Sequence, residues 1–465
     1  MLKIKIPIII LGSFLLFFFY QKDEMYFESD VNNILFINEE ESIPVFNEKI
    51  TDYYARSFSS LKKNSIRFGN KTYFYKKKNI QKNETITFFV NKKKYTIHLR
   101  PDFMPDYTIT STQKEKYGYV FLTPFNGIST KNSYAYIVDT KGNLLYYRRN
   151  KQNDRYVSDF KKTILSDNQI RYTLMEQERK MPPYDYWSGS LLVMDDNFNP
   201  QKNLKLKPYN EHDELMVENH DSLMITDNHY ILSAYYPMEI FHPDTDEPIR
   251  VVATILQEIK NNKVVFEWNS TDYPQFIKTT TEKISSNKPN YVDYMHFNSL
   301  LIDPKDDNLV LSFATQSSLV KINRKNGKIV WVLGGSGDEF GLPDNMKFSN
   351  QHSPLIINSN EIVLFDNAIA SQKNLIKSKN KTSSILHLTL DEKNKKIPKW
   401  ERIQLPFYSS YMGSVQITSN QTYFVSGGSN KEISAMELDK NGQEIWRLSF
   451  NNNNTTYRAY KYDKL

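Results

Sequence analysis

"LVKINRKNGKIVWVL", residues 319–333, reads as a strand, a polar turn that contains Asn326 and Gly327, and a second strand with an aromatic residue near its end. The pattern occurs six times, with turns that begin near residues 139, 195, 258, 323, 391 and 439, so the copies lie roughly 50 to 70 residues apart. The other copies are "YIVDTKGNLLYY" from 136, "LLVMDDNFNPQKNLKL" from 191, "TILQEIKNNKVVFEW" from 254, "LHLTLDEKNKKIPKW" from 386 and "SAMELDKNGQEIWRL" from 434.

A repeated hairpin of this kind favours a closed ring of sheets. One amphipathic hairpin cannot bury its apolar face alone, whereas a ring of blades buries every face and shelters the strand edges. Propeller blades of the best-known kinds take about 40 to 50 residues, so the extra length here would lie in inserted loops. We predict an all-β fold, a six-bladed β-propeller. A β-sandwich with irregular hairpins is the alternative.

The segment before the repeats has a different pattern. Short alternating stretches such as "NETITFFVNKKKYTIHL" (83–99) indicate strands, and Pro101 and Pro105 then interrupt the alternation. We therefore predict a small β-sandwich-like N-terminal domain over residues 23–112 and a propeller catalytic domain over 113–465.

Residues 1–22 have the layout of an export signal. Lys3 and Lys5 precede an apolar run from Ile6 to Tyr20, which would form a helix of ~22 Å, short for a ~30 Å hydrocarbon core. No small-x-small cleavage site follows Tyr20, so an uncleaved anchor formed by residues 6–20 is the alternative. Either way we expect an exported protein in the periplasm or cell envelope, with anchoring in the inner membrane left open.

Composition excludes several kinds of site. The chain contains no Cys, which excludes a disulfide framework, a thiolate metal site and a Cys nucleophile. The net charge of +7 is small for 465 residues, and the basic residues are scattered, so a nucleic-acid partner is not expected.

Three of the eight histidines occupy the same place in different repeats. His220, His296 and His352 each lie in a short polar motif just before an apolar strand, in "ENHDSLMI", "DYMHFNSLLI" and "SNQHSPLII". In a propeller, equivalent positions at strand starts point toward one end of the ring. A zinc site is one interpretation of three converging imidazoles, although their local spacing has no zinc-site pattern. Nucleophilic and acid/base roles are the other, because imidazole exchanges protons near neutrality.

Several longer segments resemble the PAPS-independent bacterial arylsulfate sulfotransferase (ASST) family. They are "PDFMPDYTIT", "GYVFLTPF", "NHDSLMI", "HFNSLLIDPKDDNLVLSFATQSSLVKINRKNGKIVWVLGG", "FSNQHSP", "IVLFDN" and "YRAYKYDKL". The most specific part runs from 293 to 367. The resemblance implies a six-bladed propeller with a small N-terminal β domain, and transfer of a sulfuryl group from a phenolic sulfate ester to a phenol.

The same resemblance implies roles for individual residues. The family's nucleophile, which forms a sulfohistidine in a ping-pong reaction, falls on His352. Its other site residues fall on His220 and His296, as acid/base groups, and on Asn298, as a donor to the sulfuryl oxygens. The partners would be a small-molecule phenolic sulfate donor and a phenol acceptor, without a cofactor or a metal. A homodimer is left open.

The chain departs from the family at one position that bears on chemistry. The family carries an Arg in a Ser-Ser-Arg-like stretch, whereas "LSFATQ" places Phe313 and Ala314 there. An Arg is a natural bidentate clamp for sulfate oxygens, and its loss would cost about 10² to 10³ in rate by analogy with one oxyanion-hole donor. The alternative function is therefore an impaired propeller that binds aryl sulfates or other anions. A metal-dependent hydrolase is a third. The family's cysteine pair is also absent.

Overall fold

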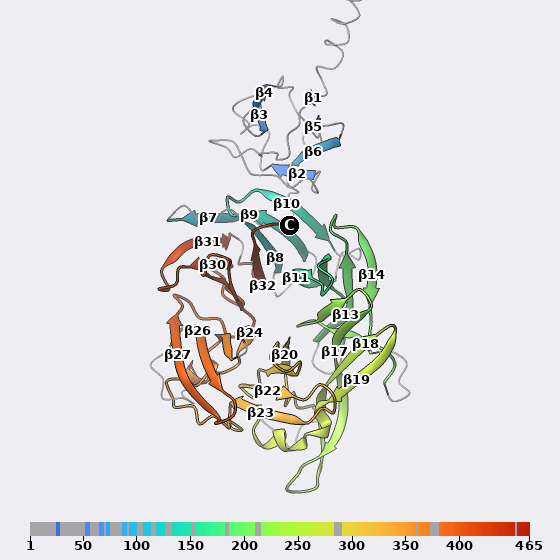
Figure 1. Ribbon diagram of the computed structural model, residues 1–465, viewed down its shortest axis with the longest axis vertical. Coiled ribbons are helices and arrows are strands. Elements are labelled where there is room, and N and C mark those ends of the chain that lie inside the picture. Colours follow the sequence, from blue (N-terminus) through green and yellow to red (C-terminus); the bar gives the residue numbers. More distant parts are fainter. Residues whose placement is uncertain are drawn as a thin grey trace, which may run out of the picture.

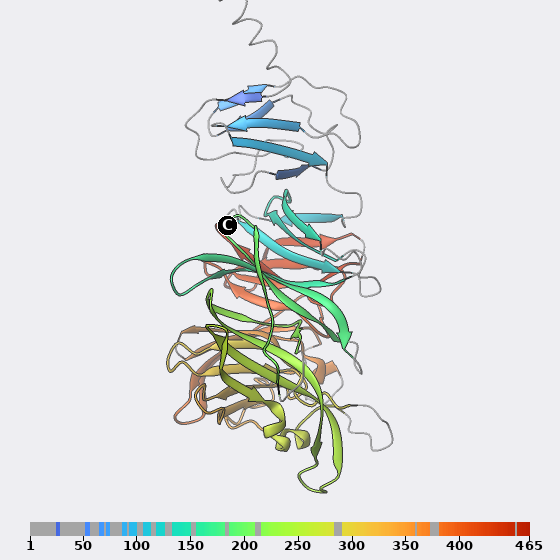
Figure 2. The ribbon, with the colours of Figure 1, turned by 90° about the vertical axis from the view of Figure 1, so that its right-hand side faces the viewer.

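The computed structural model is a ring of six β-sheets around one centre, with further short strands beside it (Figures 1 and 2). The structure describes residues 106–465 apart from 113–117, 126–132, 150–154, 182–185, 210–214, 283–290, 359, 373–380 and 452, and before residue 106 it describes six strands. The prediction of an all-β, six-bladed propeller is confirmed.

Each blade is an antiparallel sheet whose strands are ordered from the centre of the ring outward. Blade 1 comprises β32 (Thr455–Tyr462), β8 (Tyr119–Phe125), β9 (Tyr134–Asp139) and β10 (Leu144–Arg149). Blade 2 comprises β11 (Val157–Ile164), β12 (Ile170–Met181), β13 (Tyr186–Met194) and β14 (Pro200–Leu204), and β15 (Val217–Glu218) also pairs with β13. Blade 3 comprises β16 (Leu223–Thr226), β17 (His229–Phe241), β18 (Pro248–Lys260) and β19 (Lys263–Asn269).

The second half of the ring repeats this order. Blade 4 comprises β20 (Phe297–Ile302), β21 (Leu309–Phe313), β22 (Ser318–Ile322) and β23 (Ile329–Gly334). Blade 5 comprises β24 (His352–Asn358), β25 (Glu361–Asp366), β26 (Ser384–Asp391) and β27 (Lys396–Gln404). Blade 6 comprises β28 (Ser414–Ile417), β29 (Tyr423–Ser426), β30 (Ala435–Leu438), β31 (Glu444–Phe450) and β7 (Tyr107–Ser111). Short helices are η2 (Ser270–Asp272), η3 (Pro274–Lys278) and α2 (Ile369–Gln372).

The six sequence repeats are the outer hairpins of the six blades. The hairpin at 319–333 falls on β22 and β23, and the others fall on the corresponding third and fourth strands. A residue in each turn has positive φ: Gly142, Phe198, Asn262, Gly327, Lys395 and Gly442. Three of these are Gly, which adopts that conformation without steric cost.

The ring closes by exchanging strands between the chain ends. The C-terminal strand β32 pairs with β8 at the inner edge of blade 1, while the early strand β7 pairs with β31 at the outer edge of blade 6. Hydrogen bonds therefore join both ends of the propeller in a chain that has no cysteine.

Apolar cores lie between neighbouring blades. Buried clusters join blades 2 and 3, 3 and 4, 4 and 5, 5 and 6, and 6 and 1. Between blades 1 and 2 the contact is aromatic, with Phe121 packed on Phe160 and Tyr172. The inner strands are thereby held as a rigid lining of the ring.

The predicted N-terminal domain, residues 23–112, contains short strands. They are β1 (Met25–Phe27), β2 (Asp52–Ala55), β3 (Ser65–Phe68), β4 (Lys71–Phe74), β5 (Ile86–Val90) and β6 (Lys93–Leu99). β2 pairs with β10 of blade 1, and β7 at 107–111 belongs to the propeller sheet. The predicted signal at 1–22 lies outside the described residues. Of the helices in the described part of the chain, none is long and apolar enough to cross a membrane.

Candidate active site

The three predicted histidines come together in one cavity. His220 precedes β16, His296 precedes β20, and His352 begins β24, so three successive inner strands deliver them to the same end of the ring. The cavity has a volume of about 380 Å³. Its lining consists of Tyr156, Tyr186, Trp187, Asn219, His220, Glu282, Asp293, His296, Ala314, Thr315, Asn350, His352, Tyr411, Met412 and Tyr457.

The backbone around His352 is unusual. Asn350 and Ser353 both have positive φ, 52° and 45°, although neither is Gly. The pairing register of β24 with β25 also shifts just after His352. Such conformations persist only where the surrounding structure holds them, and they cluster at functional sites. The turn places the His352 side chain in the cavity.

Hydrogen bonds fix the tautomer of His352. Its Nδ1 lies 2.9 Å from the Asn350 carbonyl and 2.9 Å from Asn367 Oδ1. Asn367 Nδ2 donates to the carbonyls of Ser409 and Met412, so its oxygen must be the atom that faces the imidazole. Nδ1 therefore carries the proton, and Nε2 carries the lone pair.

The environment keeps His352 neutral. Burial is the main cause, and together with the nearby imidazoles and Arg458 it lowers the pKa of His352 to about 3, against the opposing hydrogen bond with Asn367. In the structure, the Met412 N–H donates to Nε2 over 3.2 Å. A neutral imidazole with an Nε2 lone pair is the form that can act as a nucleophile.

The other two histidines have carboxylate partners. His220 Nδ1 lies 2.5 Å from Glu218 Oε2, and His296 Nδ1 lies 2.5 Å from Asp293 Oδ2. The two rings stand edge to face with centroids 4.8 Å apart. These contacts use Nδ1 and so leave Nε2 of each ring for a substrate.

A tyrosine lies between the two pairs. The Tyr235 hydroxyl donates to the Phe297 carbonyl and lies 3.3 Å from His220 Nδ1 and 3.5 Å from His296 Nδ1. Tyr186 donates to Asp293 Oδ2 over 2.6 Å and so holds that carboxylate against His296. Both imidazoles are thereby fixed in orientation.

The pKa values of the two histidines move in opposite directions. Burial lowers the pKa of His220 and outweighs the attraction of Glu218. Burial also opposes protonation of His296, but there Asp293, with Glu218 and Glu282, outweighs it and raises the pKa. Paired groups whose pKa values are pushed apart are typical of acid/base sites. His296 holds a proton more readily than His220.

Asn298 is placed behind the cavity. Its side chain is fully buried, and Nδ2 donates to the Gln351 carbonyl over 2.7 Å, directly before His352. The predicted role of Asn298 as a donor to sulfuryl oxygens remains a prediction. In the observed arrangement, its amide holds the segment that carries the nucleophile candidate.

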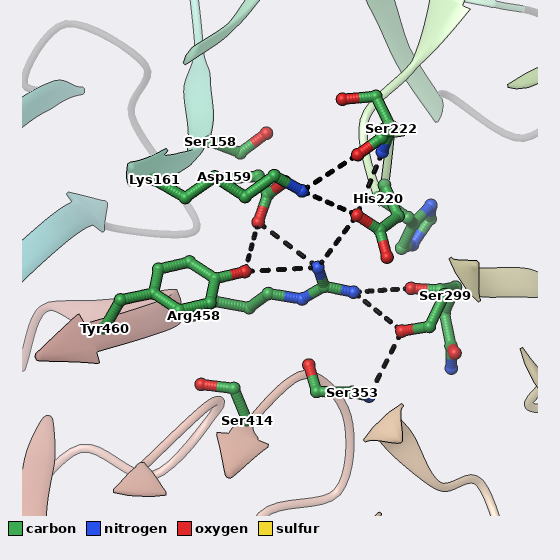
Figure 3. Close-up of polar contacts among 12 residues, drawn as sticks. Ser158, Asp159, Lys161, His220, Ser222, Ser299, Ser353, Ser414, Arg458 and Tyr460 are labelled. Carbon is green, nitrogen blue, oxygen red and sulfur yellow. Dashed lines mark hydrogen bonds and ion pairs between the residues drawn. The ribbon is translucent and has the colours of Figure 1, made fainter. Parts of the chain in front are cut away.

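Ala314, which stands where the family carries an Arg, lies in the cavity wall. Ala314 follows β21, and its N–H donates to the His296 carbonyl over 2.8 Å. Phe313 points away into the core between blades 3 and 4, where it packs with Trp268 and Phe297. The lining residues of the described chain include no Lys or Arg. A buried cation, Arg458, lies nearby on β32 (Figure 3).

Aromatic side chains form much of the cavity wall. Tyr156 and Trp187 stack with centroids 6.3 Å apart, and Tyr411 is 56% exposed. Tyr457 contacts the ring of His220. Flat aromatic surfaces of this kind suit an aromatic ligand.

Several site residues were missed from the sequence. Glu218 and Asp293 precede their histidines by two and three residues, in "ENH" and "DYMH", a spacing with no recognised pattern. Asn367 belongs to "FDN", which the family resemblance included without giving it a role. Among the described residues, no group of three or more His, Cys, Asp or Glu is arranged to hold a metal ion.

Comparison with known proteins gives the family. The model for arylsulfotransferase (ASST) matches residues 187–451, more than half of the chain. The chain belongs to the arylsulfotransferase family. The matched region contains His220, His296 and His352, whereas Arg458 lies beyond its end. Activity at the family level is therefore arylsulfotransfer, with small aryl sulfates and phenols as substrates. Members are typically periplasmic.

Solved structures match this chain at low sequence identity. A Bacteroides caccae protein of unknown function is 8% identical, with 74% of this chain and 98% of that chain covered and a TM-score of 0.43. The periplasmic gluconolactonase of Pseudomonas aeruginosa is 9% identical, with 74% and 99% covered and a TM-score of 0.38. A search of curated proteins finds no match.

The neutral partner of His352 leads to a prediction. We expect Asn367→Asp to place a carboxylate beside Nδ1 and raise the pKa of His352 above its wild-type value of about 3, because an opposite charge favours the protonated ring. In the pH profile of kcat/KM for the sulfate donor, loss on the acid side should begin at a higher pH than in the wild type. Asn367→Ala removes the hydrogen bond between Asn367 and His352 without adding a charge. The loss of activity in this variant should therefore be equal across pH. An unchanged acid side in Asn367→Asp would contradict this account of the pKa.

Proposed function

We propose that the chain transfers a sulfuryl group from a phenolic sulfate ester to a phenol through a sulfohistidine at His352. The observation that carries this proposal is the difference in partners among the three imidazoles. His352 is held by a carbonyl and an amide, which favour a neutral nucleophile, whereas a carboxylate lies against each of the other two rings and raises the pKa of His296.

In the first half-reaction, the lone pair of His352 Nε2 attacks the sulfur of the ester. A bond between Nε2 and sulfur forms as the ester S–O bond breaks, and the leaving phenolate takes a proton from His296. The raised pKa of His296 makes it the better proton donor of the two acid/base candidates. Because Nδ1 of His352 keeps its proton, the sulfated ring carries a positive charge and remains a good leaving group.

The second half-reaction is the same chemistry run backwards with another phenol. The acceptor hydroxyl gives its proton to His296, now neutral, as its oxygen bonds to sulfur. The bond between sulfur and Nε2 breaks, and the lone pair returns to His352. One acid/base group therefore serves both directions, and no cofactor enters the balance.

Two further groups are placed to hold the sulfuryl oxygens. The Met412 N–H lies 3.2 Å from Nε2, so a sulfuryl group bonded there would have an oxygen within its reach. Burial lowers the pKa of His220, whereas the negative charge of a bound ester favours its protonated form, which can donate to another oxygen.

The test is release of 4-nitrophenol from 4-nitrophenyl sulfate, with and without added phenol. We expect one equivalent of release without acceptor, continuous release with phenol, and formation of phenyl sulfate. Preincubation with a chelator should change nothing. No release with any phenol would overturn the proposal, and loss with chelator alone would favour the metal-dependent hydrolase.

A binding module without turnover is the second candidate. It is favoured by Ala314 and by the lack of Lys or Arg among the described lining residues. In that case 4-nitrophenyl sulfate should bind, as measured by calorimetry, and remain intact. A titration with 4-nitrophenyl sulfate, followed by product analysis, therefore distinguishes the two functions.

The pH dependence of the donor half-reaction follows from the two pKa directions. His296 must be protonated, and its pKa lies above the ordinary 6.5, so kcat/KM for the donor should fall as pH rises through that raised value. His352 must be neutral, and its pKa of about 3 predicts no acid-side loss from this group above about pH 4. A profile that instead rises with pH through 6 to 8 would contradict His296 as the proton donor.

We also propose that the enzyme is exported, with residues 1–22 as its signal. The apolar run behind Lys3 and Lys5 has the layout of an export signal. Cell fractionation, with N-terminal sequencing of the mature protein, tests export, cleavage and anchoring together.

A further inference from the structure

We propose that Arg458 is a positioning residue that holds the strands carrying the three histidines. The inference deepens the proposed function and rests on it for its kinetic consequences. Arg458 lies on the C-terminal strand β32, and its side chain is 3% exposed. Figure 3 shows the guanidinium reaching from β32 across the ring toward Ser299.

The contacts of Arg458 join four blades. Nη2 donates to the Asn298 carbonyl over 2.6 Å and to Ser299 Oγ over 2.8 Å, both on β20 of blade 4. Nη1 lies 3.2 Å from Asp159 Oδ1 on β11 of blade 2 and 3.4 Å from Asp221 Oδ1, between β15 and β16. The planar fork of an Arg can make these contacts at once, which a Lys cannot.

Two of the residues that contact Arg458 also contact the backbone close to the histidines. Ser299 Oγ also accepts the N–H of Ser353, the residue with positive φ directly after His352. Asp221 follows His220 in the chain, and its Oδ2 accepts the Leu300 N–H of blade 4. Movement of the guanidinium would therefore release the backbone next to two of the three imidazoles.

Strand bulges occur where β11, β20 and β32 contribute to the polar cluster around Arg458. The strand register shifts at 158–161 in β11, at 297–299 in β20 and at 456–459 in β32. Asp159 has a positive φ of 49° within its bulge. Three of the inner strands thus depart from regular pairing where they contribute to this cluster, which is a feature of strands that aim a side chain at a site.

The charge of Arg458 also acts on the site. The cluster balances two cations, Arg458 and Lys161, against Asp159 and Asp221. Loss of Arg458 leaves two buried carboxylates with one cation. Its charge is among the causes that lower the pKa of both His352 and His220, so its loss raises both. The other groups facing this region are Glu218, Asp293, His296, Tyr457 and Tyr460.

Two substitutions at position 458 separate geometry from charge. Arg458→Lys keeps the charge and loses the fork, so kcat should fall about 10²-fold with an unchanged pH profile. Arg458→Gln loses both, so kcat should fall similarly and the acid-side loss should move to higher pH. Ser299→Ala removes only the hydroxyl between Arg458 and Ser353. It should lower kcat without changing the pH profile. This variant tests the positioning role even if a variant at position 458 does not fold.

The matched control is Lys461→Met. Lys461 lies on the same strand and forms an equally buried ion pair, 2.5 Å from Glu437 in blade 6, away from the cavity. It should lower the melting temperature and leave kcat and the pH profile unchanged. If Arg458→Gln behaves like Lys461→Met, Arg458 has a structural role only and the proposal is wrong.

Titration of the histidines by NMR provides a readout that does not depend on turnover. The pKa of His352 should be higher in folded Arg458→Gln than in the wild type and unchanged in Arg458→Lys. An equal pKa in all three proteins would overturn the electrostatic part of the inference. A wild type that transfers no sulfate to any phenol would overturn the proposed function, and the NMR comparison would still decide the charge effect of Arg458.

Discussion

His352→Ala is expected to abolish sulfuryl transfer, with a loss in kcat on the order of 10⁵- to 10⁶-fold, as when other covalent nucleophiles are removed. The ring supplies the only protein atom that bonds to sulfur in the proposed reaction, and the other two imidazoles of the cavity each have a carboxylate on Nδ1. The first equivalent of 4-nitrophenol should disappear together with steady-state turnover. Rapid-mixing absorbance measurements and the intact mass of the protein, which should gain one sulfuryl group in the wild type alone, check both points.

The substitution is suited to a test because it removes little from the fold. His352 lies at the start of β24 beside a cavity, so a smaller side chain leaves space that water can fill. His387→Ala on β26 is a matched control, since His387 is half-buried and 3.7 Å from Glu361, outside the site. It should retain full activity. Continued formation of a sulfated protein by His352→Ala would show that another residue is the nucleophile.

The fold could be predicted because its signal is local. Each outer hairpin carries its own alternation and turn, and half of these turns have a Gly, such as Gly327 or Gly442, at the position of positive φ. Closure of the ring could not be predicted in the same way. The pairing of β32 with β8 joins residues more than 300 positions apart and has no local pattern.

The candidate site was also predictable only in part. His220, His296 and His352 could be predicted because each begins or precedes an inner strand, so a repeat fixes their common direction. Their different chemistry could not be predicted, because it depends on partners brought in by tertiary contacts. Asn367 reaches His352 from the end of the neighbouring strand, and Arg458 arrives from the C-terminal strand.

Ala314→Arg is expected to raise kcat/KM for the sulfate donor by about 10² to 10³, the value of one well-placed donor to a developing anion. Ala314 lines the cavity beside His296, and the volume of about 380 Å³ leaves room for a longer side chain. A guanidinium there could bind two sulfate oxygens at once, as Arg does with carboxylates and phosphates. Initial rates at low donor concentration measure the effect directly.

Ala314→Met separates charge from size in this experiment. The Met side chain fills similar space without a donor, so it should lower kcat/KM or leave it unchanged. An arginine that paired with Asp293 instead would take the carboxylate partner of His296, and activity would then fall in Ala314→Arg. A fall in both variants would contradict the expectation and favour binding of the sulfate without a clamp at 314, through His220 and Met412. A gain confined to Ala314→Arg would mean that the sulfate lies beside blade 4, within reach of position 314.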